Sequence, residues 1–389
     1  MSEQERKEKL KKLIDFLKKR QDIPYISFIV SKGLLNILII YHKIGCNWHE
    51  SLCSKAAESG HLNCLKYLHE NGCPWSTDTC AFAAKNGHLD CLKYAHENGC
   101  HWNENTSAFA AEDGHLECLK YAHENGCDWN EYTCDKAAWN GHLNCLKYAH
   151  ENGCPWDKDT CSYATMNDHL ECLKYAHENG CPWDEETCRN AAMKGNLNCL
   201  KYTHENGCPW PETTCFLFVH DDIEYYSTNN IQLDSHLKCL KYAHNNGCPW
   251  STETCWLFAL WGAINCLKYA HENGCPWDEW TCSQAAGDGH LECLKYAHEN
   301  GCPWDSETCI YAARNGHLEC LKYAHENGCP YPQELKSTIV KKILIPKWRA
   351  AVKIRPYILH WMEDTSKTLC AKNGKGRKRD YDTFVEDFI

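Results

Sequence analysis

The chain has no hydrophobic run long enough to cross a membrane, which takes roughly 20 consecutive apolar residues. It also has no excess of positive charge, because 52 acidic residues stand against 41 basic ones and give a formal net charge of −11. This balance argues against nonspecific electrostatic binding to nucleic acid or to anionic membranes. Residues 1–7 are charged and no apolar signal-peptide core follows them, so we expect an intracellular protein.

Sequence motifs typical of enzymes are missing as well. There is no glycine-rich phosphate-binding loop and no serine nucleophile elbow. Pairs of cysteine and histidine are present, but they recur in about ten copies, whereas catalysis depends on one distinctive arrangement of residues. We therefore predict a protein that is not an enzyme and that needs no cofactor.

What the chain does have is a repeat of 27 residues. The segment 87–100, Gly-His-Leu-Asp-Cys-Leu-Lys-Tyr-Ala-His-Glu-Asn-Gly-Cys, returns almost unchanged at 114–127. All steps of the repeat are 27 residues except one of 40, so one repeat carries a 13-residue insert, placed at about 219–235. A fixed period in this range indicates a solenoid of stacked repeats. One aromatic residue marks each copy: Trp48, Trp75, Trp102, Trp129, Trp156, Trp183, Trp210, Trp250, Trp277, Trp304 and Tyr331.

Each repeat has the pattern of two short helices. In the copy at 75–99, Ser76 stands where an N-cap belongs, and a first helix (helix A) is expected over about 77–85. A second helix (helix B) is expected over about 88–98, with an apolar stripe at intervals of three and four residues and a C-cap at Gly99. Because neither helix can bury its stripe alone, neighbouring repeats must stack.

The 31 cysteines follow the same period. Eleven come after the last glycine of a repeat, ten lie in helix B and nine lie in helix A, which leaves only Cys370 outside the pattern. A free cysteine behaves as a small and readily buried hydrophobe. We therefore expect buried thiols between the repeats rather than disulfides.

The repeat resembles the ankyrin repeat. Residues 78–89, Asp-Thr-Cys-Ala-Phe-Ala-Ala-Lys-Asn-Gly-His-Leu, show that family's threonine-led first helix, its two alanines and its Gly-His turn, and the resemblance covers about residues 33–331. The usual ankyrin repeat has about 33 residues, and the six missing here fall where a β-hairpin finger would stand. The resemblance implies an all-α, ankyrin-like solenoid of about ten helix-turn-helix units with shortened, hairpin-less connections. It also implies that the histidine after the glycine hydrogen-bonds locally at its turn.

Metal binding is the main chemical alternative. His88, Cys91, His96 and Cys100 recur in nearly every repeat, and these are side chains that zinc prefers. However, His88 and His96 are more than two helical turns apart, and Asn196 and Ala263 replace the first histidine in two repeats. We therefore predict no metal site and keep a zinc-binding repeat protein as the third hypothesis.

The ends of the chain depart from the repeat. Residues 1–32 form an expected amphipathic helix that caps the solenoid or, alternatively, binds a partner helix or a membrane surface. Residues 33–331 form the solenoid, 332–367 a C-terminal helical cap and 368–389 a disordered tail. The tail holds the basic cluster Lys375–Arg379, which has the composition of a nuclear-import signal. The Cys-Pro-Trp pattern resembles ankyrin-type proteins of giant DNA viruses of protists and of some protists themselves. A viral origin implies the host cytoplasm as the location, and the basic cluster Lys375–Arg379 gives the nucleus as the alternative.

Function is expected to lie in the part of the repeat that varies. Helix B hardly changes from copy to copy, whereas helix A does, and in ankyrin-like solenoids the first helices line a concave face that binds partner proteins. We predict a monomeric scaffold with an unidentified protein partner. The predicted partner-binding residues are Trp139, Tyr163, Arg189, Phe216, Trp256, Trp261 and Tyr311. The second hypothesis is an adaptor that recruits substrates to a host ubiquitin ligase, for which residues 1–33 or 337–389 would have to supply the ligase-binding box.

Overall fold

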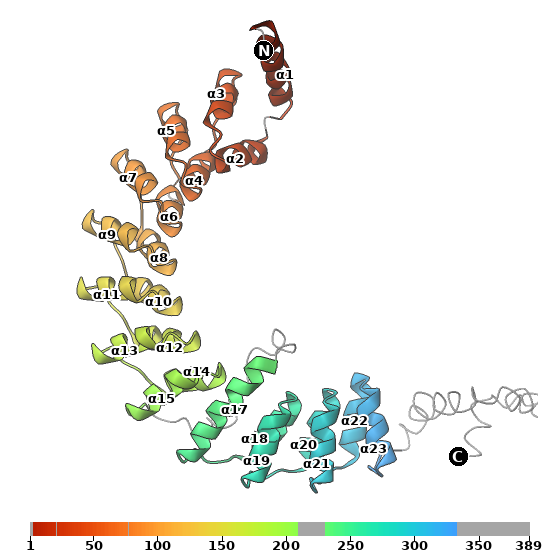
Figure 1. Cartoon of the computed structure of the whole chain (residues 1–389). Helices are drawn as coiled ribbons and strands as arrows, with labels where there is room; N and C mark the ends of the chain where they lie inside the picture. Colours follow the sequence, from red (N-terminus) through yellow and green to blue (C-terminus); the bar gives the residue numbers. More distant parts are fainter. Residues whose placement is uncertain (1–2, 21, 77, 209–229, 333–389) are drawn as a thin grey trace, which may run out of the picture. The chain divides into compact units, whose positions relative to one another are not determined.

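The structure is a computed structural model that describes residues 3–332 apart from 21, 77 and 209–229. Every regular element in these ranges is an α-helix (Figure 1). The chain divides into two compact parts, Met1–Pro211 and Glu212–Ile389, and we describe each part by itself. The all-helical repeat architecture predicted from the sequence is thus confirmed for the described residues.

The N-terminal part begins with α1 (Glu3–Lys18), α2 (Ile23–Ser31) and α3 (Leu35–Lys43). Its A helices are α4 (Ser51–Glu58), α6 (Asp78–Lys85), α8 (Glu104–Glu112), α10 (Glu131–Trp139), α12 (Lys158–Met166) and α14 (Glu185–Met193). Its B helices are α5 (Leu62–Glu70), α7 (Leu89–Glu97), α9 (Leu116–Glu124), α11 (Leu143–Glu151), α13 (Leu170–Glu178) and α15 (Leu197–Glu205). Figure 1 shows the A helices in one row and the B helices in a second row beside it.

The C-terminal part repeats the arrangement with A helices α18 (Thr252–Leu260), α20 (Glu279–Gly287) and α22 (Ser306–Asn315). Its B helices are α17 (Asn230–Asn245), α19 (Ile264–Glu272), α21 (Leu291–Glu299) and α23 (Leu318–Glu326). The end of the predicted insert, residues 230–235, forms the first turns of α17. The predicted C-terminal cap and tail lie outside the described residues.

Packing is strongest between A helices of neighbouring repeats and between the two helices of one repeat. Helix A buries small residues, such as Cys80, Ala83 and Ala84. Helix B buries the side of its surface that carries Cys91 and Leu92. Each leucine contributes about 1.5–3 kcal/mol when it is taken fully out of water. In the described ranges the cysteines are buried thiols that form no disulfide, as the sequence predicts.

The predicted N-caps are confirmed. The side chains of Asn103, Asn130 and Asp157 each accept a hydrogen bond from the backbone N–H two residues later, at 3.1, 3.1 and 2.8 Å. Such caps satisfy amides that a helix start leaves unpaired and contribute about 1 kcal/mol each. The caps therefore define where helix A begins in α8, α10 and α12.

Helix B is tied to the next repeat through a histidine, a tryptophan and a tyrosine. The indole of Trp102 stacks on the imidazole of His96 with ring centroids 3.6 Å apart and planes 12° apart. Tyr121 of the next repeat meets the Trp102 ring edge-on at 6.1 Å, and its hydroxyl lies 3.2 Å from Nδ1 of His96. The same three-ring contact recurs along both parts, so the periodic indoles pack between repeats as expected.

The histidine after the A–B turn glycine bonds locally only through its backbone: the N–H of His142 donates to the carbonyl of Ala137 at 2.8 Å, whereas the imidazole bonds outside its own repeat. Nε2 of His61 lies 3.1 Å from the backbone oxygen of Ser31, and His142 bonds the backbone of Glu112, in each case 30 residues earlier. The imidazole thus reaches across to the preceding repeat. Its ring covers that repeat's turn glycine: a Cβ built on Gly114 would lie 2.5 Å from Nδ1 of His142.

Two repeats replace the glycine, and both also lose the histidine 28 residues later. Asp168 stands in the glycine position with a left-handed backbone (φ 59°), and Asn196 stands in the histidine position. Ser235 and Ala263 occupy the same two positions in the sequence, but Ser235 lies within α17 rather than at a turn. For the first pair, a side chain at the turn would occupy the space of the imidazole, so Asp168 and Asn196 explain each other. Asn196 still donates to the backbone oxygens of Thr165 and Met166, at 2.7 and 3.1 Å.

Candidate functional site

The predicted partner-binding residues differ in how the structure exposes them. Trp139 is exposed, whereas Tyr163, Arg189, Trp256, Trp261 and Tyr311 are half-buried, and Phe216 lies outside the described residues. Tyr311 packs its Cβ over Gly287 of the preceding A helix. Trp256, Trp261 and Tyr311 belong to the C-terminal part, and the other described candidates belong to the N-terminal part.

Two of the candidates are in direct contact. The ring of Trp139, at the end of α10, meets the ring of Tyr163 in α12 edge to face, with centroids 5.2 Å apart and planes at 74°. The indole of Trp139 remains 40% exposed. Asn167 donates to the backbone oxygen of Trp139 at 2.9 Å and holds the end of α10 against the next repeat. Such an edge-to-face pair is typical of rigid aromatic surfaces.

Two exposed aromatic residues are not among the predicted binding residues, Tyr132 (51% exposed) and Trp280 (48% exposed). Both occupy the same position of helix A, just before the conserved-looking threonine of the repeat, where other repeats carry Asp, Asn, Thr or Glu. That contrast was visible in the sequence. On α10, Tyr132 and Trp139 are seven residues apart and therefore lie on one side of the helix. Lys136 lies between them, with Nζ 5.3 Å from the Tyr132 ring centroid.

We call the outward side chains of α6, α8, α10, α12 and α14 the helix-A face. An ion-pair network fixes part of it: Glu112 bonds Lys136 at 2.8 Å and Lys85 at 3.3 Å. Burial opposes ionisation of Glu112, but the two lysines outweigh it and leave the pKa of this carboxyl below its usual range. The three side chains connect α6, α8 and α10 beside the aromatic residues.

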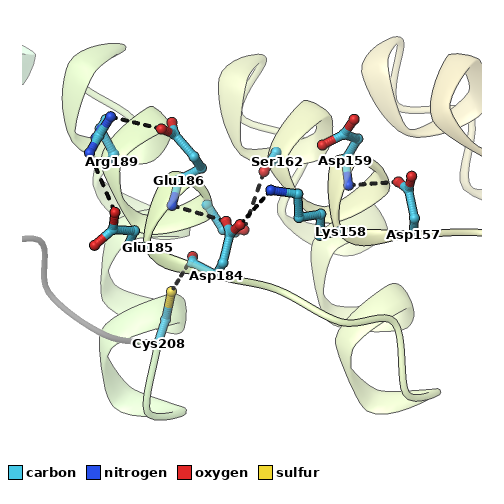
Figure 2. Close-up of polar contacts among 10 residues, drawn as sticks. Asp157, Lys158, Asp159, Ser162, Asp184, Glu185, Glu186, Arg189 and Cys208 are labelled. Carbon is cyan, nitrogen blue, oxygen red and sulfur yellow. Dashed lines mark hydrogen bonds and ion pairs between the residues drawn. The ribbon is translucent and has the colours of Figure 1, made fainter.

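A second polar network links α12 to α14, as Figure 2 shows. Lys158 bonds the carboxylate of Asp184 at 2.8 Å, and this carboxylate also accepts the backbone N–H of Glu186 at 3.0 Å. Arg189 pairs with Glu186 at 2.7 Å and with Glu185 at 3.7 Å. Arg189, a predicted binding residue, is therefore engaged by carboxylates of its own helix.

Between the A helices runs a line of buried hydroxyls. In several described repeats the residue 25 positions before the helix-A threonine faces the hydroxyl of that threonine, as in Ser54–Thr79 and Ser162–Thr187, both at 3.3 Å. Where that residue is apolar, the hydroxyl has no partner, and Thr106, Thr133 and Thr281 are such cases in the described ranges. Trp256 precedes Thr281 by 25 residues, so it belongs to the same position between helices.

In one repeat this position holds a carboxyl group. Asp135 is only 6% exposed and accepts a hydrogen bond from the Thr160 hydroxyl at 2.6 Å. Burial raises its pKa to about 6, although the bond from Thr160 acts in the opposite direction. The group is placed below the surface on α10, between Tyr132 and Trp139 in sequence.

Two further features were searched for in the described residues, a cluster of metal-ligating side chains and a membrane-spanning helix. Outside the gaps of the structure, no group of three or more His, Cys, Asp and Glu side chains is arranged to hold a metal ion. Each helix that the structure describes is too short or too polar to span a membrane.

Comparison with known proteins agrees with the repeat architecture. Residues 107–150 and 282–325 match the family model described as ankyrin repeats in many copies, so these two segments are similar to ankyrin repeats. Among solved structures, the human ASB11 ankyrin repeat domain matches with 20% identity over 40% of this chain and 84% of that chain, at a TM-score of 0.36. Among curated proteins, none matches. Ankyrin repeats generally bind other proteins and generally have no catalytic activity of their own.

Proposed function

We propose that this chain is a non-enzymatic scaffold that binds another protein through the helix-A face of its N-terminal part. The observation that carries the proposal is the exposure of Tyr132 and Trp139 on one side of α10. Large aromatic side chains on a surface are enriched at the energetic centres of protein interfaces. The aromatic residues of the B helices differ, because they are half-buried in contacts with one another.

The face is also held in place before any partner arrives. Caps fix the start of α10, Asn167 holds its end, and the Glu112 network joins it to the two preceding A helices. A surface that is already ordered loses little conformational entropy on binding, which favours affinity. In the C-terminal part, Trp280 offers a second exposed aromatic position of the same kind.

The finer hypotheses remain proposals with narrower support. The giant-virus resemblance, and with it a location in the host cytoplasm, is supported by the Cys-Pro-Trp pattern of the repeats, and a nuclear location is supported by the composition of Lys375–Arg379. A role as adaptor for a ubiquitin ligase depends on residues 1–33 or 337–389, and the second range lies outside the described residues.

Affinity purification from the cell in which the chain occurs tests the proposal. The baits are the natural chain, the double variant Tyr132→Ala/Trp139→Ala and the helix-B control Glu124→Ala/Glu151→Ala, all verified to be folded by circular dichroism. We expect one protein to copurify with the natural chain and the control but not with the aromatic variant. Equal recovery with all three baits would contradict the proposal.

A further inference from the structure

The chemistry of the partner can be read from the charges around the aromatic residues. Helices α6, α8, α10, α12 and α14 together carry eight carboxylates and four cations. Each of the four cations lies within 4 Å of a carboxylate: Lys85 and Lys136 pair with Glu112, Lys158 with Asp184, and Arg189 with Glu186. Every cation of this face is therefore paired, although Lys85 and Lys136 share one carboxylate, and over the five helices the carboxylates outnumber the cations by four.

The remaining carboxylates surround the first turns of the same helices. Asp78, Glu104 and Glu131 are exposed, and within the described ranges no salt bridge holds them. Glu131 directly precedes Tyr132, and Glu104 occupies the same position one repeat earlier. An approaching molecule thus meets exposed aromatic rings next to a row of unneutralised negative charge.

We infer that the helix-A face takes a peptide segment of a partner protein that is rich in arginine or lysine and carries an apolar or aromatic anchor. The anchor packs against the rings of Trp139 and Tyr163, and the cations pair with Glu104 and Glu131. Arginine suits both tasks, because its guanidinium binds carboxylates through two parallel hydrogen bonds and stacks on aromatic faces. This inference rests on the proposed function and specifies the partner for that same site.

The C-terminal part shows the same combination independently. There, α18, α20 and α22 carry the carboxylates of Glu253, Glu279 and Glu307 against the single cation of Arg314. Trp280, in the position equivalent to Tyr132, stands next to Glu279. An acidic residue beside an exposed aromatic ring therefore occurs in both parts.

A library of random dodecapeptides displayed on phage and selected on the full-length chain tests the inference without assuming a partner. We expect selected sequences with net positive charge and at least one Trp, Phe, Leu or Ile. Selection of acidic or uncharged sequences, or of none, would overturn the partner chemistry. The purification result with the natural partner stands apart from this outcome, so failure here is distinct from failure of the proposed function.

The most enriched peptide, labelled with fluorescein, then locates the site by anisotropy titration. We expect Trp139→Ala to weaken binding about tenfold, as hot-spot truncation commonly does. We expect Glu104→Gln/Glu131→Gln to weaken it and to flatten its salt dependence. The matched control Glu124→Gln/Glu151→Gln removes the same charge from helix B and should bind as the natural chain does. Equal losses in the two glutamine variants, or full binding by Trp139→Ala, would show that the peptide binds elsewhere.

Discussion

The coupling between the turn glycine and the imidazole of the next repeat can be tested by copying the natural exception into another repeat. Gly114 has φ +77°, and a side chain there would meet Nδ1 of His142 at 2.5 Å from its Cβ. The double variant Gly114→Asp/His142→Asn reproduces the pair Asp168 and Asn196. The two single variants complete a double-mutant cycle.

The structure sets the expected magnitudes. A left-handed backbone costs an L-residue about 1–2 kcal/mol, somewhat less for Asp. In Gly114→Asp alone, the displaced His142 ring also loses its bond to the Glu112 backbone, which adds about 1–2 kcal/mol. His142→Asn alone should cost about 1 kcal/mol, because Asn196 shows that asparagine still reaches the preceding repeat's carbonyls. In the double variant the collision is gone, so we expect a favourable coupling of about 1–2 kcal/mol.

Equilibrium urea unfolding, followed by far-ultraviolet circular dichroism, measures the four free energies of unfolding. The reverse cycle, Asp168→Gly and Asn196→His, serves as the internal control: Asn196→His should destabilise the natural chain and be tolerated once Asp168 is glycine. Effects in either cycle that add to within about 0.5 kcal/mol would refute the reasoning, because independent sites behave that way.

Three further predictions concern stability. Asp135→Ser, which copies Ser162 at the same position, should stabilise the fold at pH 7 by about 1–3 kcal/mol. Burial raises the pKa of Asp135 to about 6, against about 4 in the unfolded chain, so the natural chain loses stability as the pH rises from 4 to 6 and Asp135 ionises. At pH 4 this carboxyl is protonated in the folded chain, so the gain from Asp135→Ser should vanish in urea titrations at that pH. Ala108→Ser should give the orphan hydroxyl of Thr133 a partner and raise stability by up to about 1 kcal/mol after the helix-propensity cost, whereas Ala110→Ser on the same helix should lower it. Burial lowers the pKa of His88, His142 and His290 in the folded chain, so the melting temperature should fall as the pH drops from 7.5 to 5.5. The variant His142→Asn should show a smaller fall in melting temperature. A fall as large as that of the natural chain would argue against this cause.

Much of the fold was predictable because local sequence signals in each repeat mark where its two helices begin and end. Helix A over 78–85 and helix B over 89–97 follow from the caps, the apolar stripe and the glycines. The partner of the turn histidine was not predictable: a periodic sequence does not reveal whether His142 bonds within its own repeat or to Glu112 of the repeat before. Only the packing of consecutive repeats decides that.

The candidate site was predictable in part. Variation in helix A correctly singled out Trp139 as an exposed aromatic residue. Periodicity does not show how far each side of a short helix is covered by the next repeat. The sequence therefore predicts Trp256 as a binding residue just as it predicts Trp139, although Trp256 is half-buried. Tyr132 was not predicted because the variation that marked the candidates lies after the helix-A threonine, whereas Tyr132 directly precedes Thr133.

Site-specific photocrosslinking tests the central claim most directly. Benzoylphenylalanine replaces Tyr132 on the helix-A face in one protein and Glu124 on helix B in another, and each is irradiated in the cell in which the chain occurs. The account predicts a covalent adduct with one other protein from position 132 and none from position 124. An adduct from position 124 alone, or the same adduct from both, would contradict it.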